Sequence, residues 1–433
     1  MSRRCPLRSR RPCRAQRQTA TIDRVIRAFF ADALLDPATG ETVKEAVVLV
    51  EDGRVKAAGR RASISVPADC ERIDASGLTL LPGLIDCHVH LTSLGEGLDF
   101  ALWLTTPPTF ELLGAVRAAR RTLDAGFTAV RDAAGSPAGV RMAIDAGYFP
   151  GPRMLVTITA LSQTGGHTDV HFMCGADLDI PLPDRPHGTV DGVEPMGRRV
   201  RELIRAGADW IKLCTSGGVL SPGDQPHHAA LTLDEIKAAV AEAGAQGRKV
   251  MAHAQANAGI KNALRGGVAT IEHGIWLDDD AIEMMLDGGN ALVPTLVAPQ
   301  WVIRHSDAGK MPAFAADKAR AVVADHSASI RQAIEAGVKI AFGTDTGVGP
   351  HGSNGEEFLL MQALGMAPID CIRSATTVAA ATIGMPGVGH LKEGSWADLI
   401  GVPGDPLADL NLIATPDNVH LVAKGGEIVK SRP

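Results

Sequence analysis

LPGLIDCHVHL, residues 81–91, is the stretch that decides the fold of this chain. It joins an apolar run, typical of a buried β-strand, to two histidines, His88 and His90, spaced two residues apart. Side chains at i and i+2 on a strand point to the same side, so both imidazoles can face one interior. The stretch therefore predicts a buried strand that ends at a polar site.

Similar short apolar runs recur along the chain and alternate with Ala-rich helical stretches. Thr232 and Glu235 form a capping box at the start of one of these helices. The pattern predicts eight strands, at 81–86, 128–132, 154–158, 210–213, 250–253, 270–273, 291–294 and 339–343. The helices expected between them include 112–125, 140–147, 195–206, 233–246 and 315–336. Such alternation favours a (β/α)8 TIM-type barrel. An open doubly wound sheet is the alternative, but no G-x-G-x-x-G follows a strand to support it.

The two ends of the chain have a different pattern from the middle. KEAVVLVEDGRVKAAG, residues 44–59, reads as a hairpin with its turn at Glu51, Asp52 and Gly53. Residues 388–433 again combine short strands with Gly-rich turns. We therefore expect residues 22–80 and 388–433 to form one small β domain, with the barrel at 81–387. Residues 1–21 are expected to be a disordered Arg-rich tail.

Composition excludes several classes of protein. The 433 residues are 45% hydrophobic and 21% charged, which is ordinary globular composition. The net charge is −6 although residues 1–20 carry seven arginines, so the remainder is acidic and no nucleic-acid partner is expected. Seven scattered cysteines without CxxC spacing indicate free thiols in a reducing compartment. No run of about 18 apolar residues and no signal-peptide pattern is present, so we expect a cytoplasmic protein without a membrane partner.

Potential metal ligands stand at the ends of five of the eight strands. Besides the histidine pair of the first strand, they are Lys212 in WIKLCTSGG, His253 in VMAHAQ, His273 in TIEHG and Asp345 in IAFGTDTG. All strand C-termini of a barrel open onto one face, so these six side chains would converge. A lone histidine at a strand end is usually an ordinary loop residue. The whole set indicates a metal site, because neutral imidazole suits zinc-like ions and aspartate supplies charge.

These motifs, in this order, strongly resemble the amidohydrolase superfamily. The matching stretches are LPGLIDCHVHL, IKLCTSGGV, MAHAQ, TIEHG and FGTDTG, while VEDGRVKAAG and LKEGSWADLIGVPGDPL resemble the β-sandwich that flanks the family's barrel. The resemblance is to the branch with imidazolonepropionase-like proteins, Xaa-Pro dipeptidases and ochratoxin-type amidases. It implies a β-sandwich built from both chain ends, and a hydrolase that activates water on a binuclear metal centre.

The resemblance also implies a role for each ligand. His88, His90 and Asp345 would hold one divalent ion, and His253 and His273 the other. The ions would be Zn²⁺, with Mn²⁺ or Co²⁺ as alternatives. Lys212 would bridge them as a carboxylated lysine, since an ammonium group has no lone pair. An unmodified lysine that faces solvent or contacts the substrate is the alternative. Asp345 and Lys212 are the catalytic residues in this interpretation, with Asp345 passing a proton to the leaving nitrogen.

Substrate contacts are less determined. QTGGHTD, residues 163–169, resembles a dipeptidase segment whose histidine, here His167, meets the substrate carboxylate. Gln255 stands where dipeptidase relatives often have tyrosine, and Gly217 in the Gly-Gly turn is a third candidate. Residues 92–110 and 215–230 are long enough to act as lids.

Three hypotheses about the activity stay open at this point. The first is cleavage of a dipeptide or N-acyl amino acid, and the second is hydrolysis of a cyclic amide, carbamate, anilide or lactone. The third is an inactive binding protein on the same fold. We expect a small-molecule amide as the partner and a homo-oligomer as the assembly.

Overall fold

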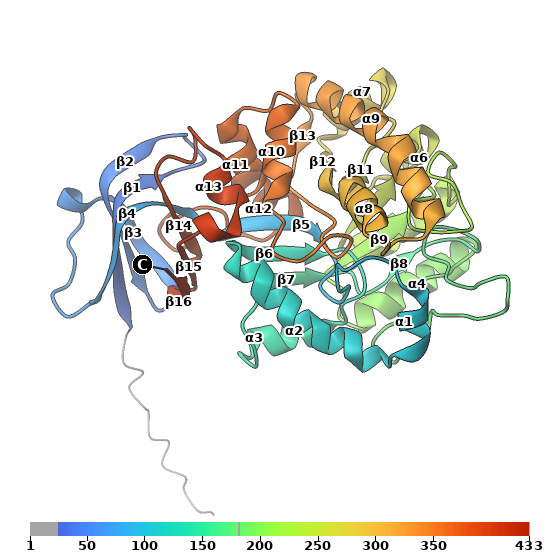
Figure 1. Ribbon diagram of the computed structural model, residues 1–433, viewed down its shortest axis with the longest axis horizontal. Coiled ribbons are helices and arrows are strands. Elements are labelled where there is room, and N and C mark those ends of the chain that lie inside the picture. Colours follow the sequence, from blue (N-terminus) through green and yellow to red (C-terminus); the bar gives the residue numbers. More distant parts are fainter. Residues whose placement is uncertain (1–24, 181, 433) are drawn as a thin grey trace, which may run out of the picture.

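The computed structural model describes residues 25–180 and 182–432. Figure 1 shows a sheet built from both ends of the chain on one side and an α/β unit on the other. The Arg-rich tail predicted over residues 1–21 lies outside the described residues. The division of the chain into domains at 80/81 and 387/388 stays a prediction.

The sheet formed by the chain ends has seven strands in the order β16-β15-β14-β4-β1-β2-β3. The predicted hairpin is present, since β2 and β3 pair antiparallel across a turn in which Asp52 has a φ of 50°. The four N-terminal strands are β1 (Ile26–Leu35), β2 (Thr42–Glu51), β3 (Arg54–Arg60) and β4 (Glu71–Pro82). The three C-terminal strands are β14 (Leu399–Pro403), β15 (Leu421–Lys424) and β16 (Glu427–Ser431).

One buried core holds the two halves of this sheet together. Phe29 and Val48 from the N-terminal strands share a buried cluster with Leu399 and Leu421 from the C-terminal strands. The sheet is continuous because the long strand β4 pairs with β1 along its first part and with β14 at its end. The predicted packing of two separate sheets into a sandwich stays a prediction.

The remaining strands form a TIM-barrel-like α/β arrangement. One group is a six-stranded sheet in the order β13-β12-β11-β10-β9-β8, and the other has the order β5-β6-β7, with parallel pairing throughout. Neighbours in space are neighbours in sequence, unlike the reversed order of a doubly wound sheet. Backbone bonds from Cys87 N to Phe342 O (2.8 Å) and from His90 N to Thr346 O (2.7 Å) join the outer strand β5 to the segment after β13. The strands are β5 (Leu84–Val89), β6 (Phe127–Asp132), β7 (Arg153–Val156), β8 (Ala160–Leu161), β9 (Trp210–Cys214), β10 (Lys249–Ala254), β11 (Thr270–His273), β12 (Ala291–Val293) and β13 (Lys339–Ile340).

Of the eight predicted strands, 270–273 has the predicted bounds, five differ by one or two residues, and two differ by three residues. The first strand begins at Leu84, because residues 81–82 belong to β4 and Gly83 breaks the run. A Cβ atom at Gly83 would lie 2.1 Å from Thr128 Oγ1, so only glycine fits where the chain passes from the terminal sheet into the barrel. The eighth strand ends at Ile340 rather than at 343, and single bonds to β5 replace the ladder beyond it.

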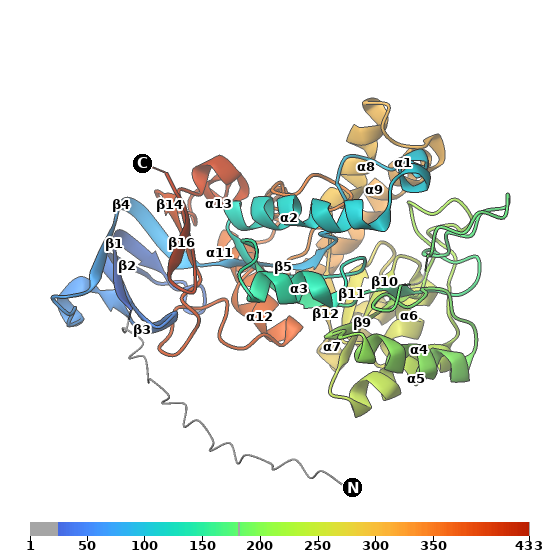
Figure 2. The same cartoon turned by 90° about the horizontal axis from the view of Figure 1, so that it is seen from below.

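Helices cover the outside of the barrel strands, as Figure 2 shows from below. The capping box predicted at Thr232 and Glu235 is present at the start of α5. The five predicted helices appear as α2 (Pro108–Asp124), α3 (Ala138–Asp145), α4 (Val193–Arg205), α5 (Leu233–Ala245) and α9 (Ala313–Glu335). The others are α1 (Phe100–Thr105), α6 (Asn257–Gly266), α7 (Asp279–Gly288), α8 (Val297–Asp307), α10 (Glu356–Ala363), α11 (Pro368–Ser374), α12 (Thr377–Ile383) and α13 (Asn411–Ala414), with short 3-10 turns at Arg61–Ser63 and Pro416–Asn418. Among the described helices, none is both long and apolar enough to span a lipid bilayer.

Candidate active site and metal centre

A cavity of about 970 Å³ opens at the C-terminal ends of the barrel strands. It collects the six side chains that the sequence predicts as metal ligands: His88, His90, Lys212, His253, His273 and Asp345. They come from β5, β9, β10, β11 and the segment after β13, far apart in the sequence. The structure thus brings every predicted ligand to one place.

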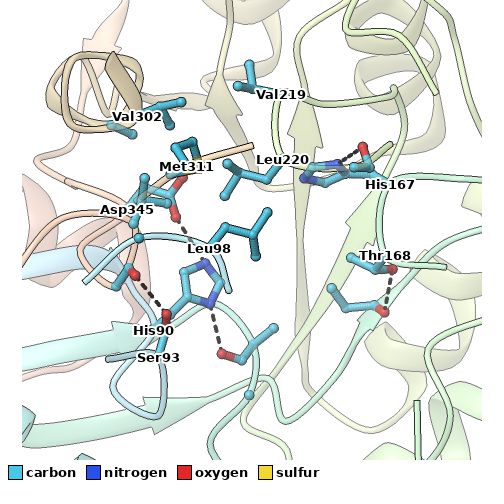
Figure 3. A pocket seen from close by; sticks show the side chains of 18 of the residues that line it. His90, Ser93, Leu98, His167, Thr168, Val219, Leu220, Val302, Met311 and Asp345 are labelled. Carbon is cyan, nitrogen blue, oxygen red and sulfur yellow. Dashed lines mark hydrogen bonds and ion pairs between the residues drawn. The ribbon is translucent and has the colours of Figure 1, made fainter. Parts of the chain in front are cut away.

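The histidines of β5 meet Asp345 on one side of the cavity. The Oδ1 atom of Asp345 lies 3.0 Å from His90 Nε2 and 3.5 Å from His88 Nε2, and Figure 3 shows the His90 contact. Donor atoms of His88, His273 and Asp345 all lie within 4.8 Å of one another, close enough to share an ion. Asp345 has a φ of 58° and His273 one of 73°, a backbone conformation that non-glycine residues rarely adopt outside functional sites.

The other two histidines continue this group of ligands. The rings of His253 and His273 lie 4.5 Å apart, and those of His273 and His88 lie 5.1 Å apart. Lys212 Nζ lies 3.3 Å from His88 Nε2, and its side chain is 3% exposed. The lysine amine therefore lies beside the histidines, inside the cavity.

Each of the four histidines has its outward ring nitrogen beside an acceptor. Carbonyl and carboxylate oxygens only accept hydrogen bonds, so the ring nitrogens of His88, His90 and His253 that meet one carry a proton, whereas the Thr295 hydroxyl beside His273 can donate or accept. In a neutral ring the second nitrogen offers a lone pair; that nitrogen of His90, Nε2, lies 3.0 Å from Asp345 Oδ1. The contacts are His88 Nδ1 with Glu272 Oε2 (2.7 Å), His90 Nδ1 with Ala134 O (2.8 Å), His253 Nε2 with Gly217 O (3.0 Å) and His273 Nδ1 with Thr295 Oγ1 (2.7 Å). This donor set fits divalent metal ions.

The electrostatics of the site agree with that fit. Burial, and then the positive charges nearby, hold the pKa of His88, His253 and His273 well below the ordinary histidine value, which keeps the imidazoles neutral. Burial also lowers the pKa of Lys212, which favours the nucleophilic free amine. Burial alone would raise the pKa of Asp345, but the adjacent His88 and His90 outweigh it and lower that pKa.

Sequence reasoning missed two buried residues behind His88. Glu272 precedes a predicted ligand on β11, and Arg131 lies on β6, and both are fully buried. Arg131 Nη2 donates to Glu272 Oε1 at 2.9 Å and Arg131 Nε donates to Cys87 O at 2.7 Å. The guanidinium thus balances the carboxylate that fixes His88. In the sequence, the indication of this pair is that Arg131 and Glu272 carry opposite charges and both lie within strands predicted to be buried.

His326 is a third residue that the sequence did not single out. From α9 its Nε2 atom lies within 3.0 Å of the carbonyl oxygens of His273 and Pro294, and its ring lines the cavity. Burial lowers its pKa to about 4. Through these hydrogen bonds His326 stabilises the end of β11, next to the predicted ligand His273.

The predicted substrate contacts lie on one wall of the cavity. His167 and Gln255 line it, whereas Gly217 meets the site through its carbonyl, which accepts from His253. Burial lowers the pKa of His167 to about 4, and its ring stacks on His253 with centroids 4.2 Å apart. Gln255 is buried, and its Oε1 atom has no hydrogen-bond partner among the described residues. These residues are available to a ligand.

The opposite wall is apolar. Figure 3 shows Leu98, Leu220 and Met311 around the space between Asp345 and His167, with Val219 and Val302 toward the top of the view. Leu98 comes from the 92–110 segment, which folds partly into α1, and Leu220 comes from the 215–230 segment. Both predicted lid segments therefore contribute to the cavity.

Comparison with known proteins gives a consistent result. The family model of the amidohydrolase family matches residues 79–429. An ochratoxinase from Aspergillus niger is 33% identical over 427 residues, which cover 95% of this chain and 88% of that protein. A solved Xaa-Pro dipeptidase with methionine bound in its active site superposes with a TM-score of 0.85 at 31% identity, and covers 94% of this chain and 100% of its own.

A prolidase solved with N-methylphosphonate-L-proline superposes with a TM-score of 0.86 at 33% identity, again over 94% of this chain and 100% of its own. A family match over most of the chain and relatives above 30% identity lead to one conclusion. The chain belongs to the amidohydrolase family and is a hydrolase that acts on C–N bonds.

Proposed function

We propose that this protein holds two divalent metal ions, most simply Zn²⁺, and hydrolyses the amide bond of a dipeptide or an N-acyl amino acid. The observation that carries the proposal is the convergence of four histidines and Asp345 on one cavity, with one ring nitrogen of each histidine held by an outer oxygen. His88, His90 and Asp345 would hold one ion, and His253 and His273 the other. When bound, such ions supply Lewis acidity and lower the pKa of water.

Lys212 bridges the two ion positions in this proposal as a carboxylated lysine. The reaction joins the free amine to carbon dioxide with loss of a proton, and converts a donor into an oxygen ligand. Its support is the burial of the amine and its 3.3 Å distance from His88 Nε2. An ammonium group at that distance would offer no lone pair to an ion.

Asp345 is the proton carrier. Its lowered pKa keeps the carboxylate ionised, so that it can accept a proton from the attacking water. The carboxylate faces the cavity beside His90, from where it can deliver that proton to the leaving nitrogen. One side chain can then serve both proton transfers of amide hydrolysis.

The substrate class rests on the two walls of the cavity. His167 and Gln255 would meet the carboxylate of the substrate, and the apolar side chains around Leu98 and Leu220 would contact the acyl side. The predicted contact through Gly217 is not part of this proposal, because its N–H donates to His228 O and its carbonyl faces His253. Ochratoxinase, Xaa-Pro dipeptidase and prolidase, the relatives named above, support an amide next to a carboxylate. The same proposal includes four further features: eight strands that close the barrel, a β-sandwich from the chain ends, a homo-oligomeric state and a cytoplasmic location.

The test is a hydrolysis panel of dipeptides, N-acyl amino acids, anilides, carbamates and lactones, with Zn²⁺ or Mn²⁺ supplied. We expect turnover of the acid amides. His167→Ala should then lower kcat/KM by roughly 10- to 150-fold on an acid substrate, because a hydrogen bond to a charged group contributes about 1.5–3 kcal/mol. The matched substrate with an amidated carboxylate should lose much less. Equal losses on both, or turnover of only the neutral substrates, would favour the cyclic amide, carbamate, anilide or lactone class.

A further inference from the structure

The loop after β9 packs against both His167 and His253. A Cβ atom at Gly218 would lie 2.1 Å from His167 Cε1, and one at Gly217 would lie 2.8 Å from Asp224 Oδ2. The Gly-Gly turn therefore has no room for a side chain. The ring of His167 occupies the space beside Gly218, and the carboxylate of Asp224 lies beside Gly217. The carbonyl of Gly217 reaches His253 Nε2 at 3.0 Å, so one turn touches both rings.

A chain of buried polar groups lies behind this turn. His167 Nδ1 is 2.8 Å from Ser221 Oγ, and Ser221 Oγ donates in turn to Asp224 Oδ1. The other carboxylate oxygen, Asp224 Oδ2, accepts from Gly218 N at 3.0 Å. Asp224 thus holds the turn with one oxygen and the serine with the other.

Lys318, on α9, is the last member of this group of buried polar residues. Its Nζ atom lies 3.1 Å from Gly218 O, 2.6 Å from Ser221 O, 2.6 Å from Asp224 O and 3.4 Å from Asp224 Oδ1. An ammonium group has three donors, so the loop carbonyls saturate it while its charge balances the carboxylate. The side chains of Lys318 and Asp224 are only 10% and 8% exposed, so water screens this pair little.

The direction of the hydrogen bonds follows from the chemistry of the groups. An ionised carboxylate only accepts, so the single hydroxyl hydrogen of Ser221 is directed to Asp224. Ser221 can then meet His167 only as an acceptor, which places the ring proton of His167 on Nδ1. The Nε2 atom is left with a lone pair, on a ring that lines the cavity, so His167 can donate to a substrate carboxylate only after Nε2 takes up a proton.

We propose that Lys318, Asp224 and Ser221 form a buried positioning unit for the active site. The unit fixes the orientation and tautomer of His167 and holds the Gly217 carbonyl against His253. It rests on the proposed function only in treating His167 as a residue that faces the substrate. Lys318 is therefore a positioning residue although it lies about 100 residues from the loop in sequence.

Histidine tautomers in the zinc-loaded enzyme test the unit without any substrate. In protein labelled with ¹⁵N-histidine, the His167 signals are those lost in His167→Gln, and we expect Nδ1 to be protonated in the wild type. In Asp224→Asn the amide oxygen keeps the bond from Gly218 N, so its NH₂ group donates to Ser221. The serine hydrogen then turns to His167, and the ring proton should move to Nε2. A wild-type proton on Nε2, or the same tautomer in both proteins, would overturn the proposal.

Lys318→Met tests the second part, with Arg320→Met as its matched control. Both remove one positive charge from α9, but Arg320 forms an exposed pair with Asp307. We expect Lys318→Met to speed amide hydrogen exchange in residues 215–230 and to lower kcat/KM by about 10- to 100-fold, the range for outer partners of metal ligands. Arg320→Met should stay within about twofold. Equal exchange in the two variants would refute the role of Lys318, and it would do so whatever substrate the hydrolysis panel identifies.

Discussion

The two halves of the proposed metal centre are supported in different ways. On the side of β5, His88 is fixed by a carboxylate inside the barrel, Glu272, whose charge Arg131 balances. On the other side, His253 is hydrogen-bonded to a backbone carbonyl of the loop after β9, and His273 is hydrogen-bonded to the hydroxyl of Thr295 after β12. The first half therefore depends on the barrel interior, whereas the second half shares its supports with the segments that line the substrate cavity.

Two buried glutamates make the same contrast. Glu272 has an arginine beside it, whereas the carboxyl of Glu357 accepts only backbone bonds, from Leu296 N (2.9 Å) and Val297 N (2.8 Å). Those two residues follow Thr295, the partner of His273, at the start of α8. Glu357 thus anchors the second half, and no described side chain of opposite charge contacts its carboxyl.

The largest effect should come from removing a ligand of the first half. We expect His88→Ala and Asp345→Asn each to lower kcat/KM by more than about 100-fold, beyond the loss that outer partners of metal ligands cause. Bound metal, measured by elemental analysis, should fall in parallel. Near-normal turnover of either variant with no added metal would contradict the metal-dependent mechanism.

In the proposed mechanism Lys212 joins the two halves, so its loss should be almost as severe. Lys212→Ala deletes the proposed bridge, and we expect activity to fall below detection in ordinary buffer. Short carboxylic acids such as acetate or propionate should restore part of it, because a free carboxylate can take the bridging position. A crystal structure with an unmodified Lys212 directed away from two bound ions would refute carboxylation.

A smaller loss should separate the supports of the two halves. In Glu272→Gln the neutral amide has one acceptor oxygen, so it can no longer accept hydrogen bonds from both His88 and Arg131. It also no longer balances the charge of Arg131, so the guanidinium stays buried without a countercharge. We expect the affinity for metal to fall about 10- to 100-fold, measured by competition with a chelator. Glu356→Gln is the control, since it removes the charge of a glutamate in an exposed pair with Arg304, away from the ligands. Equal affinities in the two variants would mean that Glu272 does not support the first half.

The sequence was sufficient to predict that the six proposed ligands converge on one cavity, because each stands at the end of a strand within a short motif. His88, Lys212 and Asp345 required only the rule that barrel strands open onto one face. The supports were not predictable in this way, because they join residues distant in the chain. Asp224 reaches His167 across 57 positions through Ser221, and Lys318 reaches the same loop from a later helix.

Strand ends show the same limit. The segment after Ile340 was predicted as strand because it is apolar, yet its backbone makes only isolated bonds with β5. Its turn toward the cavity is what places Asp345, with its positive φ, beside His90. Residue type predicted the chemistry here, whereas tertiary contacts determined the backbone path.

The smallest expected effect concerns the pH dependence of stability through Glu357. Burial raises the pKa of this carboxyl to about 8, and the nearby Asp86 adds to that direction. The folded protein therefore holds this proton more tightly than the unfolded chain, in which an ordinary glutamate titrates near pH 4.3. The contribution of Glu357 is complete below that pH and is lost as the pH rises toward 8.

Glu357→Gln removes this titration while keeping the size of the side chain. The difference in free energy of unfolding, wild type minus variant, should shrink between pH 4.5 and 8 by at least about 1.4 kcal/mol, the equivalent of one pKa unit. Urea unfolding at several pH values measures it, and the titrations of groups that do not interact with Glu357 cancel in the difference. Glu356→Gln, in the exposed pair with Arg304, should show a constant difference. A constant difference for Glu357→Gln as well would mean that the anchor of α8 is not a buried carboxyl with a raised pKa, and the contrast with the charge-balanced Glu272 would be lost.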